Sequence, residues 1–246
     1  MDGDWGRTKE TLTNAFFGDN SITEMPRIFS NFANLVWLNL DSNNIEELFK
    51  DCLPPNMHTL SINNNLLKEF PQSLGGLKEL TWLYMRGNDL RYLELPDFHS
   101  SNLELIDVSE NSIEWMKTPN LSNHTVKVRD FNLAGNKLVS LPRRMFDRLE
   151  TRRIHLSSNS IRNVDKEAFR GLEDSLEYLN LENNNLPSVP SAVNQLKILS
   201  YLYLANNEIK NISSEAFQEF AEHLKALSLA TNSLDAVPVV ALSRYF

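Results

Sequence analysis

Apolar residues recur along this chain in a fixed short order, with polar residues between them. In the segment Leu35–Ile45, apolar residues stand at the first, fourth, sixth and eleventh positions and an asparagine at the ninth; Leu176–Leu186 repeats the order. Apolar positions three and then two apart place their side chains on one face of a short strand, because successive strand residues point to opposite faces. Each segment is therefore predicted to form a short strand with one buried face.

The asparagine of this pattern marks a repeat along nearly the whole chain. It recurs about ten times, roughly 22 to 25 residues apart, at Asn20, Asn43, Asn65, Asn88, Asn111, Asn136, Asn159, Asn184, Asn207 and Asn232. One coil of this length cannot bury its apolar side alone, whereas stacked coils form a continuous core with a parallel strand ladder. The pattern predicts an α/β solenoid, a horseshoe of about ten repeats with a parallel inner β-sheet.

Two kinds of position carry most of this prediction. Leu179, Leu181, Leu202 and Leu204 are expected to be almost fully buried. The amide of Asn184 can donate and accept, so it is expected to bond the backbone where the chain leaves the strand. Its neighbour Asn183 is expected to face solvent, and its replacement to be nearly neutral.

The pattern resembles that of leucine-rich-repeat proteins over about residues 12–246. In the second half two repeat kinds alternate: Ile161–Leu172 matches Ile209–Phe220 with an Ala-Phe element, and Leu186–Pro190 matches Leu234–Pro238. This alternation is similar to the double repeats of chaoptin-type and other invertebrate extracellular leucine-rich-repeat proteins. The resemblance implies a receptor-like or glycoprotein segment at the cell surface or in the matrix, with a role in adhesion, recognition or matrix organisation.

Other interpretations stay open. The segment Phe70–Leu80 is similar to intracellular leucine-rich-repeat scaffolds of the Ras-suppressor kind, which implies a cytoplasmic scaffold that regulates a signalling enzyme. A third hypothesis is an enzyme whose catalytic domain lies outside this chain. No cysteine-bearing cap seals the repeats, and Phe246 comes where another strand is due. We therefore expect residues 1–246 to be one repeat domain of a longer protein, with residues 1–11 as an atypical N-terminal extension; membrane anchoring of the longer protein stays open.

Local departures from the pattern predict looser coils. Thr151 replaces the first leucine of the seventh coil, and the stretch from Lys117 to Thr125 is irregular.

Composition narrows the function class. A hydrophobic share of 41% is that of an ordinary globular protein, and the net charge of −8 argues against nucleic acid as a partner. The chain has no apolar run of the roughly 20 residues that span a bilayer, and its start lacks the pattern of a secretory signal. Cys52 is expected to be a small buried hydrophobe rather than a nucleophile. The compartment, extracellular or cytoplasmic, stays open on composition alone.

The outward positions of the strands form the candidate protein-binding face, expected to be concave. They are Phe16, Trp37, Asn39, Trp82, Tyr84, Arg86, Asp107, Asp130, Asn132, Arg153, His155, Tyr178, Asn180, Glu182, Tyr201 and Tyr203. Tryptophan and tyrosine dominate interface hot spots, which favours the aromatic members as binding residues. The alternative is that these rings are cross-strand packing partners of one another.

A basic belt stands out on this acidic chain. Its members are Lys127, Arg129, Lys137, Arg143, Arg144, Arg148, Arg152, Arg153, Arg162, Lys166 and Arg170. Such a belt could attract an acidic protein or, outside the cell, a sulfated glycan. The alternative is that arginine stems cover apolar surface with their charged heads in water.

The sequence carries no pattern of an enzyme or a cofactor site. The histidines have no metal-ligand spacing, and no glycine-rich phosphate loop occurs. We therefore expect a non-enzymatic scaffold without a cofactor or metal. Asn120, Asn123 and Asn211 stand in sequons and are glycosylation candidates, although about four sequons are expected by chance at this composition.

Overall fold

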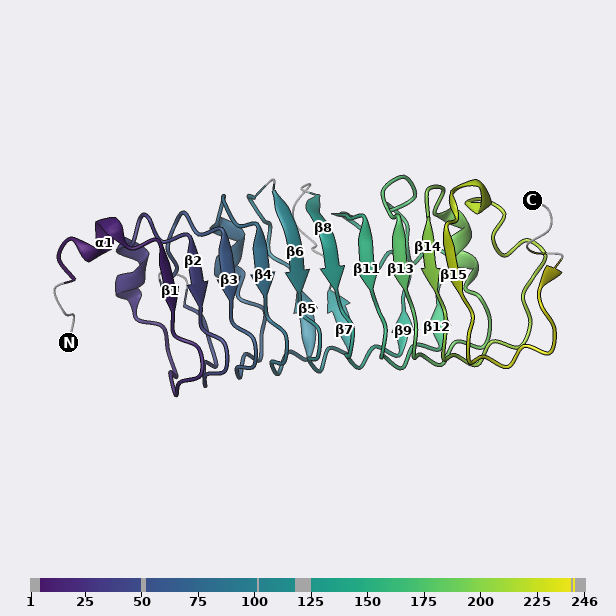
Figure 1. The fold of residues 1–246 in the computed structure, drawn as a ribbon, viewed down its shortest axis with the longest axis horizontal. Helices are drawn as coiled ribbons and strands as arrows, with labels where there is room; N and C mark the ends of the chain where they lie inside the picture. The colour runs from purple at the N-terminus through teal and green to yellow at the C-terminus, as the bar shows by residue number, and fades with distance from the viewer. Residues whose placement is uncertain (1–4, 50–51, 101, 118–124, 240, 242–246) are drawn as a thin grey trace. The chain divides into compact units, whose positions relative to one another are not determined.

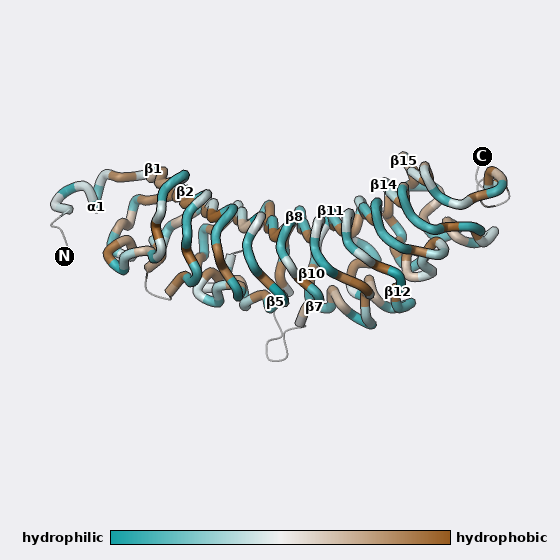
Figure 2. The backbone as a smooth tube through the Cα atoms, turned by 90° about the horizontal axis from the view of Figure 1, so that it is seen from below, coloured by the Kyte–Doolittle hydropathy of each residue, from teal (hydrophilic) through white to brown (hydrophobic). Residues whose placement is uncertain are grey.

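The chain folds into two stacks of coils. The computed structural model describes residues 5–49, 52–100, 102–117, 125–239 and 241. The two compact units are Met1–Val128 and Arg129–Phe246. Within each unit, every coil passes once through a short strand and returns through an outer segment (Figures 1 and 2). The predicted leucine-rich-repeat solenoid with a parallel sheet is confirmed; that both units form a single domain stays a prediction.

The first unit contains five parallel strands in sequence order. They are β1 (Asn14–Phe16), β2 (Trp37–Asn39), β3 (Thr59–Ser61), β4 (Trp82–Tyr84) and β6 (Leu103–Asp107). A separate two-stranded sheet pairs β5 (Tyr92–Glu94) with β7 (Trp115–Lys117). Strands of only three to five residues are long enough to form this sheet. At least one residue of each strand points into the core, and the apolar contacts between stacked coils supply the rest of the stabilisation.

The second unit repeats the arrangement. Its main strands, in the order of pairing, are β8 (Val126–Asn132, from Arg129 onward in this unit), β11 (Arg153–His155), β13 (Tyr178–Asn180), β14 (Tyr201–Tyr203) and β15 (Ala226–Ser228). Away from this sheet, β9 (Ser140–Leu141) pairs with β12 (Asn163–Val164), and β10 (Leu149–Glu150) is a further short strand.

Short helical turns form parts of the outer segments. They are α1 (Thr8–Thr11) and the 3-10 helices η1 (Arg27–Asn31), η2 (Gln72–Gly76), η3 (Ser191–Gln195) and η4 (Ala221–His223). A proline immediately precedes η1, η2 and η3, and its fixed φ sets the direction of the first turn. In the N-terminal extension, the ring of Trp5 lies 5.6 Å from that of Phe32 and 6.3 Å from that of Phe29. The extension is therefore packed against the first coil.

The core of each unit is a column of apolar side chains, one from the middle of each strand. Leu38, Leu60 and Leu83 have no exposed surface in the first unit, and neither do Leu179 and Leu202 in the second. Leu181 and Leu204 are equally buried, so the burial predicted for these four leucines is confirmed. The Ala-Phe element of the outer segment is also internal, with Phe169 stacked on Phe146 at 5.7 Å.

The pattern asparagines form a ladder that joins neighbouring coils. Asn184 is 6% exposed, and its Nδ2 donates to the carbonyls of Leu181 in its own coil (3.1 Å) and Leu156 in the preceding coil (3.0 Å). Its Oδ1 accepts from the amide of Ile161 at 2.9 Å. Asn88 makes the same three kinds of bond in the first unit. The expected role of the asparagine is confirmed.

Each coil also turns through a left-handed residue just before its asparagine. These residues are Asp19, Ser42, Asn64, Gly87, Glu110, Gly135, Ser158, Asn183, Asn206 and Thr231. Asn183 is exposed as predicted, but its φ of 54° is a conformation that costs most L-residues energy. A nearly neutral effect on stability is therefore expected only when Asn183 is replaced by a residue that readily adopts the left-handed conformation, and not for its replacement in general.

Two single-residue expectations have different outcomes. Cys52 is fully buried, and its Sγ donates to the carbonyl of Phe49, as expected of a residue that serves the core. The looser coil expected at Thr151 is not seen: the residue is buried, and its hydroxyl lies within hydrogen-bond distance of the carbonyls of Arg129 (3.2 Å) and Arg153 (3.1 Å), to either of which it can donate. The hydroxyl thus has partners in place of the apolar contacts of a leucine. The irregular stretch lies mainly at residues 118–124, outside the described residues.

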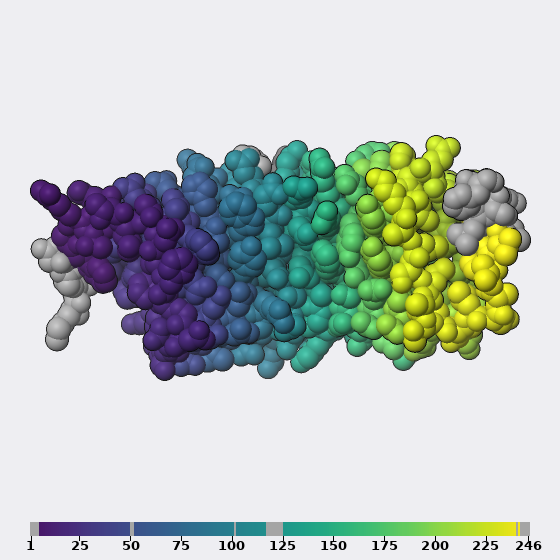
Figure 3. All heavy atoms as spheres, viewed as in Figure 1, coloured from purple at the N-terminus to yellow at the C-terminus, as the bar shows by residue number. Residues whose placement is uncertain are grey.

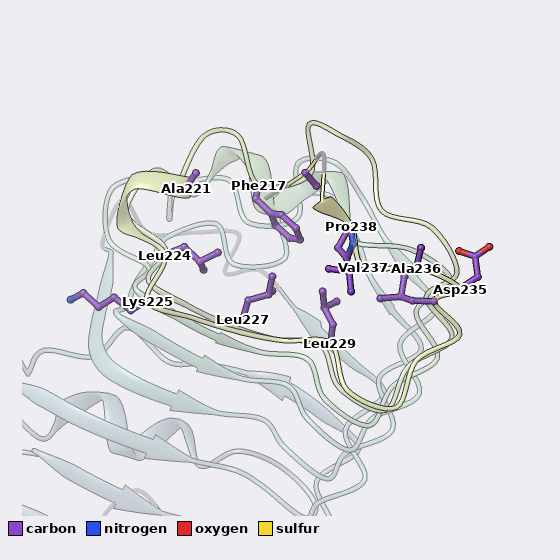
Figure 4. Close-up of a pocket in the computed structure, with 12 residues that line it drawn as sticks. Phe217, Ala221, Leu224, Lys225, Leu227, Leu229, Asp235, Ala236, Val237 and Pro238 are labelled. Carbon is purple, nitrogen blue, oxygen red and sulfur yellow. The ribbon is translucent and has the colours of Figure 1, made fainter. Parts of the chain in front are cut away.

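The last described coil of the second unit borders an apolar hollow. Figure 4 shows Phe217, Leu224, Leu227 and Leu229 pointing toward a common space beside Val237. Leu227 and Leu229 are half-buried there, whereas their counterparts one coil earlier are fully buried. Full burial of a strand leucine thus requires coils on both of its sides.

Candidate functional site

The described residues contain no cluster of side chains that could hold a metal ion. Within residues 5–49, 52–100, 102–117, 125–239 and 241, no three His, Cys, Asp or Glu side chains are grouped to hold a metal ion. None of the helices in that part of the chain combines the length and hydropathy needed to cross a bilayer. The site predicted from the sequence consists of the outward side chains of the strands, which we call the strand face of each unit.

On the strand face of the first unit, parallel pairing lines up side chains in rows. Trp37 of β2 is in register with Thr59 of β3, which is in register with Trp82 of β4. The next row is Asn39, Ser61 and Tyr84. Two tryptophans thus flank the small side chain of Thr59, two strand spacings apart, or roughly 9 to 10 Å. Figure 1 shows the three strands side by side, and the space-filling view from the same side shows their coils as adjacent bands (Figure 3).

This arrangement leaves a recess of about 520 Å³. We call it the tryptophan recess; it is lined by Trp37, Asn39, Thr59, Ser61, Asn63, Trp82 and Tyr84. The indoles are 44% and 41% exposed at Trp37 and Trp82, respectively, which is unusual for such large apolar side chains on paired strands. Phe16 packs edge-on against Trp37 from the other side, with ring centroids 5.0 Å apart. The wall at Trp37 is therefore supported from outside the recess.

The floor of the recess is a closed hydrogen-bond network. Asn63 donates from Nδ2 to the hydroxyl of Ser61 at 3.0 Å, and that hydroxyl donates to the carboxylate of Asp41 at 2.7 Å. The same carboxylate accepts hydrogen bonds from the backbone N–H of Asn63 (2.6 Å) and from Nδ2 of Asn39 (2.9 Å). Because these polar groups hold one another, the floor is rigid before any partner arrives.

Several polar residues predicted for binding have a structural task. The side chains of Asn39, Asp107 and Asn180 each accept a hydrogen bond from the backbone amide two residues further on, where the strand ends. Asn132 does the same. These hydrogen bonds fix the backbone where the chain leaves the strand. Because the side chains are half-buried, only part of each is accessible to a partner. Arg86 is exposed and pairs with Glu110 at 2.6 Å.

On the strand face of the second unit, three tyrosines and a histidine contact one another. The ring of Tyr178 lies 5.3 Å from that of Tyr203, 6.2 Å from Tyr201 and 4.9 Å from His155. All four side chains are half-buried. We call this group the tyrosine cluster. Its members are cross-strand packing partners, as one interpretation of the sequence expects; that they also bind a partner stays a prediction.

Charged groups surround the tyrosine cluster. The guanidinium of Arg153 and the ammonium of Lys225 each lie 6.0 Å from a ring centroid, of Tyr178 and Tyr201 respectively. His155 Nε2 lies 3.0 Å from the carboxylate of Asp130. Burial raises the pKa of the Tyr178 phenol above its usual value, so this ring stays neutral at physiological pH. Glu182 adds an acidic, half-buried side chain next to Asn180.

Part of the predicted basic belt is neutralised within the unit. Arg143 forms a bidentate ion pair with Glu167. Arg170 also contacts the Glu167 carboxylate, at 3.2 Å. The bond from Arg143 is the largest of the causes that lower the pKa of Glu167. Arg152 lies 3.5 Å from Glu177. These pairs reduce the positive field that the sequence alone indicates for the belt.

The glycosylation candidates differ in what the structure says of them. Asn120 and Asn123 lie outside the described residues. Asn211 is exposed, and its backbone forms a single bridge with Ser188. Its side chain is therefore accessible, as modification requires.

Sequence reasoning missed the floor of the tryptophan recess. It selected Trp37 and Trp82 as large aromatic residues and passed over Thr59, Ser61 and Asn63, whose small size creates the hollow. The signal was available in the repeat register, because small residues at the two outward strand positions of one coil stand between tryptophan-bearing coils. Asp41, which holds the floor together, also went unnoticed.

The curated proteins to which this chain is similar are much longer than the chain. Mouse oligodendrocyte-myelin glycoprotein is 31% identical over 133 residues, which are 53% of this chain and 29% of that protein. Human leucine-rich repeats and immunoglobulin-like domains protein 1 is 29% identical over 54% of this chain and 12% of its own length. The chain thus spans less than a third of these curated relatives.

Solved structures agree on the fold. A leucine-rich-repeat protein of Leptospira interrogans has a TM-score of 0.51 and 25% identity, covering 91% of this chain and 68% of that chain. A chain of the Drosophila Toll–Spatzle complex has a TM-score of 0.69 at 20% identity, covering 94% of this chain and 35% of its own. The second likeness concerns the fold alone.

The family assignment comes from a match over most of the repeats. The family model described as "Leucine rich repeat" matches residues 33–90, 126–186, 150–209 and 175–234, more than half of the chain. These segments contain β2 to β4, β8 to β15, the four leucines predicted to be buried and most of the asparagine ladder. The chain belongs to the leucine-rich-repeat family.

Proposed function

We propose that this chain is the recognition segment of an extracellular or cell-surface leucine-rich-repeat protein, a non-enzymatic scaffold whose strand faces bind a protein partner. The observation that carries the proposal is the placement of exposed aromatic rings on those faces. Trp37 and Trp82 keep more than two fifths of their surface in solvent, although paired strands and a full core lie directly beneath them. Large rings exposed on a rigid sheet are what interface hot spots use.

The remaining proposed contact residues surround these anchors. In the first unit they are Asn39, Tyr84, Arg86 and Asp107; in the second they are Asp130, Arg153, His155, Tyr178, Asn180, Glu182, Tyr201 and Tyr203. Half-buried polar groups beside aromatic anchors fit a rim that excludes water and sets orientation.

The extracellular location is supported by the relatives. They include a glycoprotein of myelin and bovine Toll-like receptor 6, which is 33% identical over 81 residues. One relative favours the alternative of a scaffold attached to a signalling enzyme. Adenylate cyclase of Schizosaccharomyces pombe is 29% identical over 142 residues, 54% of this chain and 8% of its own length. We place the extracellular function first because receptor and glycoprotein names recur among the relatives.

The test is capture of a partner on an array of purified extracellular protein domains, with the biotinylated chain as probe. A domain that binds is then titrated with Tyr201 and Tyr203 both changed to Ala, and separately with Trp37 and Trp82 both changed to Ala. We expect at least one double variant to bind at least about tenfold more weakly. Changing Arg152 and Arg153 to Ser should instead slow association and weaken its salt dependence.

The matched control is Trp115→Ala. Trp115 is 50% exposed, like the anchors, but it lies on β7 of the separate small sheet and stacks on Tyr92. Because Tyr201 and Tyr203 contact Tyr178, their loss is expected to cost up to about 1 kcal/mol of stability per contact, so folding is checked by thermal melting. Full binding by both folded strand-face variants, or a loss confined to the control, would refute the strand faces as the site.

A further inference from the structure

We propose that the tryptophan recess of the first unit captures an arginine side chain from a basic segment of the protein partner. This inference rests on the proposed function and makes it more specific, because it names the chemistry that one strand face recognises. It follows from three properties of the recess: the spacing of its walls, the state of its floor and the charge near it.

The walls suit a flat group. Trp37 and Trp82 stand on β2 and β4 in the same register, with only Thr59 of β3 between them. Two strand spacings, roughly 9 to 10 Å, leave room for a planar group in contact with both indoles once the rings lean inward. Guanidinium is planar and stacks on aromatic faces better than ammonium does, which favours arginine over lysine. Tryptophan is the ring to which cations bind most strongly.

The floor argues against a sugar ring, the other common guest of paired aromatic residues. A sugar needs several unoccupied hydrogen-bonding groups to match its hydroxyls. Here the carboxamide oxygens of Asn39 and Asn63 already accept from the backbone amides of Asp41 and Arg86, and the Ser61 hydroxyl already donates to Asp41. Rearranging this network for a ligand would leave buried polar groups without partners.

The charge of Asp41, which is bonded to the floor residues, completes the argument. In the described part of the chain, every hydrogen bond to the Asp41 carboxylate comes from a neutral donor, namely Ser61, Asn63 or Asn39. Its negative charge is therefore not balanced by a cation in direct contact. Arg86, one row along from Tyr84, is held by Glu110 at 2.6 Å, so its charge is offset. A cation in the recess would sit between two electron-rich rings, near the Asp41 carboxylate that bonds the floor residues.

The experiment uses short peptides in place of the unidentified partner. Four peptides, acetyl-Gly-Xaa-Gly-amide with Xaa as arginine, citrulline, lysine or leucine, are titrated into the chain labelled with 5-fluorotryptophan. The chain has four tryptophans, whose ¹⁹F resonances are assigned by single Trp→Phe variants. We expect the arginine peptide to shift the Trp37 and Trp82 resonances and to leave those of Trp5 and Trp115 in place. Citrulline, which has the shape of arginine without the charge, should bind about tenfold more weakly.

Single-residue variants separate the contributions of the two tryptophans and of Asp41 to arginine binding. Trp82→Ala and Trp37→Ala should each weaken arginine binding about tenfold, whereas Trp115→Ala should leave it unchanged. Asp41→Asn keeps the shape of the floor and removes its charge, and it should weaken binding of arginine but not of citrulline. An unchanged Trp5 resonance in every variant, and an unchanged Trp115 resonance in those that keep Trp115, show that the variant is folded. N-acetylglucosamine trimer serves as the sugar probe.

The outcomes divide clearly. Equal affinity for arginine and citrulline, preference for leucine, or binding of the sugar trimer at Trp37 and Trp82 would overturn the inference. So would the absence of any shift at the solubility limit of the arginine peptide. The peptide titration needs no partner, so it can fail while partner capture still depends on the strand faces; in that case the proposed function stands and only the arginine assignment is lost. Conversely, arginine binding in a chain that captures no partner would preserve the site and remove the broader proposal.

Discussion

Asn184 accepts a hydrogen bond on Oδ1 from the backbone amide of Ile161, a residue of the preceding coil, at 2.9 Å. Its Nδ2 donates to carbonyls of both coils, so one side chain satisfies backbone groups that the turn would otherwise bury without partners. This relationship recurs coil after coil, and it makes the asparagine the residue that transmits stacking from one repeat to the next.

Asn184→Ala is expected to destabilise the chain by about 1 to 3 kcal/mol, because the buried amide of Ile161 and two buried carbonyls lose their partner. Denaturant unfolding followed by circular dichroism measures the change. A loss below about half a kcal/mol would mean that water or a neighbouring group takes over these bonds.

Asn183, next to it, tests backbone conformation rather than hydrogen bonding. Its φ of 54° leads us to expect that Asn183→Ala costs about 1 kcal/mol, whereas Asn183→Gly is close to neutral. The two variants are compared in the same unfolding experiment. Equal stability of the alanine and glycine variants would contradict a strained backbone at this position.

Leu181→Ala should cost about 2 to 5 kcal/mol, because a fully buried side chain would be replaced by a cavity between coils. Lys210→Ala, at an exposed position of the next coil, serves as a surface control and should change the stability much less. The free energy of unfolding of each is compared with that of the unmodified chain. If Leu181→Ala is as mild as the control, the assignment of the core column is wrong.

Gly87→Ala is expected to destabilise the first unit by about 1 to 3 kcal/mol. Gly87 has a φ of 69°, and an added Cβ would overlap Oδ1 of Asn64. Gly76→Ala is the matched control, since an added Cβ there meets nothing within 4 Å. Melting curves of the two variants should differ clearly; coincident curves would show that the turn at Gly87 relaxes without cost.

The repeated positions were predictable because each obeys a local rule that the chain states about ten times. Leucine spacing determined which residues enter the core, and it placed Leu179, Leu181, Leu202 and Leu204 correctly. The asparagine column followed from the need to satisfy a buried turn. Outward strand positions followed from alternation, so the candidate binding residues were found on the strand faces.

Contacts between coils could not be obtained in this way, because they depend on how neighbouring side chains fill space together. Only the tertiary structure showed that Thr59 leaves a hollow between Trp37 and Trp82, since the hollow depends on the size of one side chain and the support of its neighbours. The pairing of Arg143 with Glu167, which reduces the basic belt, joins residues of different coils that no repeat rule links. The sequence by itself determined the strands, the core and the asparagine ladder, whereas the tertiary structure decided which exposed side chains already have partners and which remain available to another molecule.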